Sequence, residues 1–121
     1  MVITLPFPPA ELFPNRANGK HWSSTRAKKD AYRDEAFYIA KAAKFSDVWL
    51  AAAQRETDGI ALKVTFVQPD NRHRDMDNML AAAKHALDGF AKAIGVDDKR
   101  FRPITIDWTR EKGAGSLIVE I

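Results

Sequence analysis

The chain has 121 residues, of which 45% are hydrophobic and 29% charged, and its net charge is +3. This length fits a single globular domain spanning residues 1–121 and is too short for two. No stretch approaches the roughly 20 apolar residues of a membrane-spanning helix, and we expect no secretory signal at the amino terminus. The absence of cysteine excludes disulfides and thiolate metal ligands, and it fits a cytoplasmic protein.

Basic residues are concentrated in two segments. Residues 26–44 contain six Lys and Arg against three acidic residues, and residues 99–112 contain five against two. Such segments can be ordinary solvated surfaces. They can also bind DNA phosphates, because Lys and Arg release counterions from DNA. The sequence leaves both interpretations open.

Hydrophobic periodicity predicts the elements of the amino-terminal half. Residues 2–7 indicate a strand, and residues 8–23 lack an apolar repeat and indicate a long loop. Ser23 or Ser24 is expected to cap a helix that runs to about Lys44. A second, short helix is expected over residues 48–54, capped by Ser46 or Asp47.

In the carboxyl-terminal half, strict alternation over residues 60–66 indicates a half-buried strand that ends before Pro69. A long amphipathic helix is expected to begin near Asp75 or Asp77 and to end near Gly95. Two further alternating runs follow, and the link over residues 111–115 suggests a hairpin between them. We therefore predict one α/β (α+β) domain in the order β-α-β-α-β-β, with a mixed sheet packed against two long helices.

The segment Arg-Asp-Met-Asp-Asn at residues 74–78 carries the first candidate site. Asp75 and Asp77 lie where a loop enters the long helix, so their oxygens can converge on one cation. The amino terminus of a helix also favours negative charge. Alternatively, Asp75 is a helix N-cap and Asp77 a first-turn acid.

A second acidic pair, Asp97-Asp98, follows the long helix. That helix is a spacer of roughly 25 Å at 1.5 Å per residue. Asp98 must therefore return along the neighbouring strand or reach Asp77 from a partner subunit. Hard cations such as Mg²⁺ bind two or three carboxylates and keep several waters.

These motifs resemble those of the RusA-type Holliday junction resolvases, a family of crossover junction endodeoxyribonucleases. The resemblance also includes Pro69-Asp70, Asp88-Gly89 and the opening Ile-Thr-Leu-Pro at residues 3–6, and so covers nearly the whole chain. It implies a small homodimer that cuts two strands of a four-way DNA junction with Mg²⁺ or Mn²⁺. By position, it implies that Asp75, Asp77 and Asp98 bind the metal.

The chain departs from the family pattern at Ala81, where a lysine is common. Asp77, Ala81, Lys84 and Asp88 share one face of the helix, because seven residues return to within about 20° of the start. Lys84 is therefore a candidate to supply the missing charge at the catalytic site. Alternatively, it pairs with Asp88 at the surface.

Several basic residues are candidates for DNA contacts. Arg72 and Arg74 can clamp a phosphate, or they can form an ion pair with Asp70 or Asp75. The other candidates lie in the long loop and after the acidic pair: Arg16, Lys20, Lys99 and Arg100. Contacts of this kind fix position and read shape rather than sequence.

Two other classes of function remain open. One is a protein that binds DNA junctions or other nucleic acids without cleaving them, for which Ala81 is the argument. The other is a metal-dependent phosphohydrolase of small substrates, which would leave the basic segments unexplained.

Overall fold

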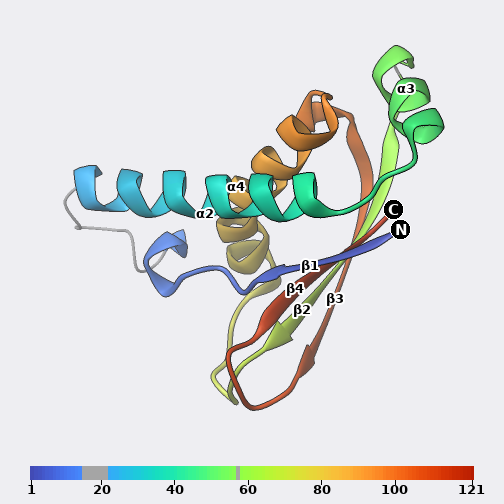
Figure 1. Cartoon of the computed structure of the whole chain (residues 1–121). Helices are drawn as coiled ribbons and strands as arrows, with labels where there is room; N and C mark the ends of the chain where they lie inside the picture. The colour runs from blue at the N-terminus through green and yellow to red at the C-terminus, as the bar shows by residue number, and fades with distance from the viewer. Residues whose placement is uncertain (15–21, 57) are drawn as a thin grey trace.

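The computed structural model of the protein describes residues 1–14, 22–56 and 58–121 (Figure 1). The elements in chain order are β1 (Val2–Pro6), the 3-10 helix η1 (Ala10–Leu12), α2 (Trp22–Ala42), α3 (Asp47–Arg55), β2 (Ile60–Gln68), α4 (Met76–Ile94), the 3-10 helix η2 (Asp98–Arg100), β3 (Phe101–Arg110) and β4 (Ser116–Glu120). The predicted order of strands and helices is confirmed. The short helix predicted over residues 48–54 is α3, and Ser46 caps it by accepting a hydrogen bond from Trp49 N at 3.3 Å.

The four strands form one mixed sheet in the order β1-β4-β2-β3. β2 is parallel to β3 and antiparallel to β4, and β4 is antiparallel to β1. β2 is an inner strand, and alternate residues along it, from Leu62 to Gln68, are buried. The alternating pattern of residues 60–66 therefore predicted both the strand and its buried face correctly.

The predicted hairpin between the last two strands is wrong. β4 pairs with β1 and β2, so β3 and β4 lie on opposite sides of β2. The connection over residues 111–115 passes the end of β2 instead of folding back along β3. Backbone hydrogen bonds fasten it there, from Glu111 N to Gln68 O at 2.9 Å and from Gly113 N to Pro69 O at 3.2 Å. Alternation identifies a strand but does not specify its neighbours.

α2 and α4 cover one face of the sheet, and the core lies between these two helices and the sheet (Figure 1). Leu62, Val64 and Phe66 point into this core from β2 and are at most 2% exposed. From the helical side, α4 contributes the fully buried Met79 and Phe90. Burial of apolar side chains of this size is the main stabilising contribution in such a domain.

Small residues let α2 and α4 approach closely. Ala36 and Ala40 of α2 are buried, as are Ala82, Ala83 and Ala86 of α4. At Gly89 the two helix backbones nearly touch: a Cβ there would lie 2.1 Å from the carbonyl oxygen of Arg33. The long helix identified from the sequence is thus packed tightly against the first one.

Tyr32 ties α2 to the end of β1. Its hydroxyl donates a 2.7 Å hydrogen bond to the carbonyl oxygen of Pro6, and its side chain is 2% exposed. Burial, and to a lesser degree the nearby Glu35, raises the pKa of the Tyr32 hydroxyl above its usual range. The hydroxyl therefore stays a hydrogen-bond donor, and the chain leaves β1 at a fixed point.

Part of the segment predicted as a long loop over residues 8–23 forms a short helix and buries two side chains. Residues 10–12 form η1, and Leu12 and Phe13 are 4% and 7% exposed. Two apolar residues are too few to show periodicity, which is why the pattern missed them. Residues 15–21 of the predicted loop lie outside the described residues.

Among the helices of the described residues, none is both long and apolar enough to cross a membrane.

Replacing Gly89 with Ala should destabilise the fold. The added Cβ meets backbone atoms of Arg33 and Phe37, which cannot rotate away. Overpacking of this kind costs about 3 kcal/mol at the upper end, and better helix propensity returns about 1 kcal/mol. We expect the free energy of unfolding, measured by urea denaturation, to fall by about 2 kcal/mol. The matched control is Lys92→Ala, an exposed change on the same helix, which should stay within about 0.5 kcal/mol; equal stability of the two variants would contradict the close helix contact.

Candidate functional site

The two acids of the Asp-Met-Asp motif lie at the start of α4. Asp75 is the N-cap residue, with extended backbone (φ −72°, ψ 140°), and its carbonyl accepts from Met79 N at 3.0 Å. Within the described residues its side chain makes no capping hydrogen bond; Oδ1 lies 3.0 Å from His73 Nε2. Asp77 occupies the first turn and is exposed. The N-cap alternative thus holds for the Asp75 backbone, while both carboxylates are accessible at the positive end of the helix dipole.

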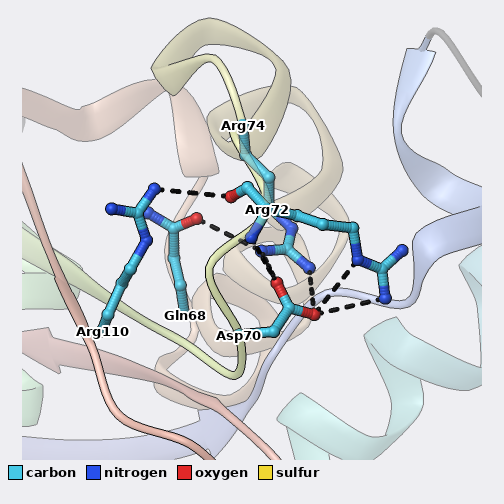
Figure 2. A network of polar contacts seen from close by, with 5 residues as sticks. All are labelled: Gln68, Asp70, Arg72, Arg74 and Arg110. Carbon is cyan, nitrogen blue, oxygen red and sulfur yellow. Dashed lines mark hydrogen bonds and ion pairs between the residues drawn. The ribbon is translucent and has the colours of Figure 1, made fainter.

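Asp70 organises the segment that leads to these acids (Figure 2). Its carboxylate accepts two hydrogen bonds from the Arg74 guanidinium, at 2.8 and 3.1 Å. It also accepts from the backbone N–H and the Nε of Arg72, at 3.0 and 3.2 Å. Of the two alternatives for Arg72 and Arg74, the structure shows the ion pair, with Asp70 as the shared acid. The Arg74 side chain, and then the Arg72 N–H, hold the pKa of the Asp70 carboxyl well below its usual range.

Arg74 is held from other directions as well. Its Nη1 donates to Gln68 Oε1 at 3.3 Å, and its guanidinium lies 5.3 Å from the centre of the Phe7 ring. Only 14% of the Arg74 side chain is exposed, and Gln68 is 1% exposed. A bidentate carboxylate pair has a specific geometry. Arg74 therefore fixes the end of β2, the segment after β1 and the acidic motif relative to one another.

A pocket of about 310 Å³ opens beside this network. Phe7 and Phe13 line it with stacked rings, whose centroids are 6.3 Å apart. Arg72 and His73 also line it, and their side chains are 67% and 87% exposed. Because His73 contacts Asp75, the pocket lies next to the acidic motif.

A second cavity, also of about 310 Å³, is lined by Asp70, Asn71, Arg110 and Lys112. Arg110 lies over the Trp108 ring at 4.8 Å, and its Nη2 donates to the carbonyl oxygen of Arg72 at 3.5 Å (Figure 2). Neither Arg110 nor Lys112 forms an ion pair with any acidic side chain of the described ranges. The two cavities share Asp70, and more basic than acidic side chains surround them.

Asp98 lies away from the acidic motif within the chain. It opens η2, whereas Asp77 is in the first turn of α4, whose 19 residues span about 28 Å. The parallel register pairs Ile60 with Phe101, so η2 lies beside the start of β2, while Asp75 follows the end of β2 (Figure 1). A return of Asp98 to the motif along the neighbouring strand, one of the two routes open from the sequence, is not what this fold provides.

The two acids of the later pair differ in their surroundings. Asp97 Oδ1 accepts from Lys99 N at 2.9 Å, and this hydrogen bond is the largest cause of a lowered pKa of the Asp97 carboxyl. Loss of solvation, followed by the neighbouring Asp97 and Asp88, raises the pKa of the Asp98 carboxyl. Asp97 therefore caps η2, and the carboxylate of Asp98 is not used for that cap.

Arg100, predicted to contact DNA, is engaged in the fold. Its Nε donates to the carbonyl oxygen of Asp58 at 3.1 Å, and its Nη1 donates to the carbonyl oxygen of Ala53. These bonds hold η2 against the end of α3. Lys99 beside it is exposed.

The remaining predicted residues are not gathered around the motif. Lys84 is exposed on α4, and among the described residues it forms no ion pair with Asp88. Arg16 and Lys20 lie outside the described residues. In the part of the chain that the structure describes, no three His, Asp or Glu side chains come together as a set that could hold a metal ion.

Two residues that organise the site were missed from the sequence, Gln68 and Phe7, whereas Asp70 was expected as one of two possible ion-pair partners of the arginines. Asp70 stands two and four residues before the two arginines, a spacing that a turn can close into ion pairs. Gln68 could have been noticed as a candidate for the site, because it is a polar residue at a core-facing position of an alternating strand. The position of Phe7 depends on how β1 is placed in the sheet, and no local pattern indicates that.

No family model matches this chain. An uncharacterized protein of Xylella fastidiosa (strain Temecula1) is 36% identical over 122 residues, which cover 98% of this chain and 74% of that protein. The chain therefore belongs to the same family as the Xylella protein.

Replacing Asp70 with Asn should weaken the fold in a pH-dependent way. A carboxyl whose pKa is lower in the folded than in the unfolded protein contributes stability above its unfolded pKa, near 4. That contribution is lost as the pH falls through the folded value. We expect the parent to be more stable than Asp70→Asn by a constant margin from about pH 7 to pH 5, and by a shrinking margin toward about pH 2.

Urea unfolding at each pH measures this margin. The matched control is Glu111→Gln, which removes a carboxylate from the adjacent connection. It should show no comparable margin at neutral pH. A margin for Asp70→Asn that grows as the pH falls would contradict the ion-pair network.

Proposed function

We propose that this protein is a metal-dependent, structure-selective DNA endonuclease that resolves four-way junctions, as RusA-type resolvases do. The observation that carries the proposal is the pair Asp75 and Asp77. Both carboxylates are exposed at the start of α4, and the Asp75 side chain forms no capping hydrogen bond with any described residue. This is the motif on which the resemblance to the resolvases rests.

The donor set fits Mg²⁺ or Mn²⁺. Hard cations prefer carboxylate oxygens and keep several waters, so two or three acids suffice. The contact of His73 with Asp75 is exposed and therefore easily exchanged for a cation. When bound, the metal would activate water and neutralise growing phosphate charge.

The chain's own residues position and orient the DNA strand. The Arg74–Asp70 pair holds the acidic motif in one place, since Arg74 directly precedes Asp75. Arg72, Arg110 and Lys112 offer exposed or unpaired cationic groups along the cavities for phosphate contacts. Lys99 lies at η2, away from these cavities, and would contact phosphates there.

We infer that a complete site needs two subunits. In one chain Asp98 and Asp77 lie toward opposite ends of α4, so a metal held by both requires Asp98 of the partner subunit. A four-way junction has two-fold symmetry, which an isologous homodimer matches. Each dimer would then carry two shared sites, one for each cut strand.

Mixing two inactive variants tests this arrangement. Asp77→Asn and Asp98→Asn should each abolish Mg²⁺-dependent cleavage of a labelled junction while keeping gel-shift binding. In a heterodimer of the two, one site has lost both acids and the other is intact. An equal mixture should therefore regain about a quarter of the parental sites and nick one strand at a time.

Asp97→Asn is the matched control for Asp98→Asn, and it should cleave nearly as well as the parent because Asp97 caps η2. If both single variants are inactive and the mixture stays inactive, each site is built within one chain. If the parent binds the junction but never cuts it with Mg²⁺ or Mn²⁺, the protein is a binding protein instead.

Lys84 is the proposed substitute for the lysine missing at position 81. It is exposed on the Asp77 face of α4, so it is available to a bound phosphate. Lys84→Ala should slow single-turnover cleavage about tenfold, which corresponds to about 1.4 kcal/mol. Adding Ala81→Lys to that variant should restore much of the rate. Lys92→Ala, an exposed lysine in the last turn of α4, is the control, and a Lys84→Ala rate within twofold of the parent would discard this role.

A further inference from the structure

We propose that the pocket lined by Phe7 and Phe13 binds one unpaired nucleobase of a DNA strand, with a neighbouring phosphate of that strand on Arg110 and Lys112. This inference rests on the proposed function, because it assigns how the same site recognises branched DNA.

The walls of the pocket suit a base. A volume of about 310 Å³ lies at the lower end of small-ligand pockets, which suits a single ring system rather than a large ligand. Phe7 and Phe13 supply aromatic surface, and Pro8 and Pro69 supply further apolar surface. The Arg74 guanidinium lies over the Phe7 ring, so a base would stack on the ring surface that still faces the pocket. Such stacking accepts every base, because each base has a π face.

Polar groups at the pocket can hydrogen-bond the edge of a base. Arg72 is largely exposed, and the Asp70 side chain is 34% exposed. An exposed ion pair is weak, so Arg72 can turn from Asp70 to a ligand at little cost. Asp70 then keeps both hydrogen bonds from Arg74, and the network around the acidic motif stays intact.

The second cavity suits the phosphate next to that base. It borders the first at Asp70, and Arg110 and Lys112 line it without an ion pair to any described acid. The pocket with the aromatic rings and the cavity with Arg110 and Lys112 lie side by side, as the base and the phosphates do along a single strand. The lining residues and the adjacency of the two cavities therefore favour a strand over a free base.

The position of the pocket gives it a role in selecting the substrate. His73 lines the pocket and contacts Asp75, so a strand anchored there passes the acidic motif. Extracting a base from an intact duplex costs unpairing and unstacking free energy, whereas a base beside an open branch point lacks a stacking neighbour on one side, so extracting it costs less. A base pocket beside the acids would favour branched over linear DNA.

A titration with two short oligonucleotides tests the pocket. The probes are a thymidine trinucleotide and an abasic trinucleotide with the same phosphates, and binding is followed by NMR of the full chain. The thymidine probe should shift the ring signals of Phe7 and the amide of Ala10, which lines the pocket. The abasic probe should shift signals of Arg110 and Lys112 but leave the rings unchanged.

Two matched variants separate filling of the pocket from other effects. Ala10 is exposed in η1, so Ala10→Phe can fill the pocket without disturbing the core; Ala51→Phe makes the same change at an exposed position of α3. Ala10→Phe should weaken binding of the thymidine probe about tenfold, the effect of losing one stacked base. It should leave the abasic probe unchanged, and Ala51→Phe should change neither.

Equal ring shifts with both probes, or equal thymidine affinity for both variants, would overturn the base pocket. These results are separate from cleavage. A parent that cuts junctions while its rings ignore thymidine refutes this inference and leaves the proposed function standing. A parent that shows base-dependent shifts but never cuts supports the pocket and refutes the endonuclease.

Discussion

The bidentate pairing of Arg74 with Asp70 holds three parts of the chain together: the segment after β1, the end of β2 and the start of α4. Arg74 also reaches Gln68 at the end of β2 and the ring of Phe7 after β1, and it directly precedes Asp75. Because the guanidinium is planar and always charged, it satisfies these partners in one orientation only. Arg74 also lines the first pocket, so this one side chain links that pocket to the exposed acidic motif at the start of α4.

Local patterns predicted the elements of the fold, and long-range pairing escaped them. The alternation around Val64 and the helical spacing around Leu87 each reflect burial on one face, which is a property of the segment itself. The position of β4 between β1 and β2 is different in kind. Its alternating residues Leu117 and Val119 would fit equally well beside β3, so the sequence alone favoured the shorter connection.

The candidate site likewise has features that local sequence patterns indicate and features that depend on long-range pairing. The acidic motif was found because its residues are neighbours in sequence, and the ion pairs of the two arginines were foreseen as an alternative because they are local too. The length of α4 indicated from the sequence that Asp98 and Asp77 are far apart along the chain. Only the parallel register of β2 and β3 showed that Asp98 does not return to Asp77 within one chain. Phe7 and Arg110 reach the site only through the order of the sheet, and so no spacing in the sequence indicated them.

The insertion of β4 between β1 and β2 affects the order in which the chain can fold. During synthesis, β1 is made before the other three strands, yet its register partners lie in β4, the last of the four, with Val2 opposite Glu120. The helices and the parallel pair β2 and β3 can form earlier, because their contacts are closer in sequence. Contacts of such large sequence separation slow folding, since the loop must close before they form. β1 therefore stays unpaired until β4 has been made and joins it to the sheet.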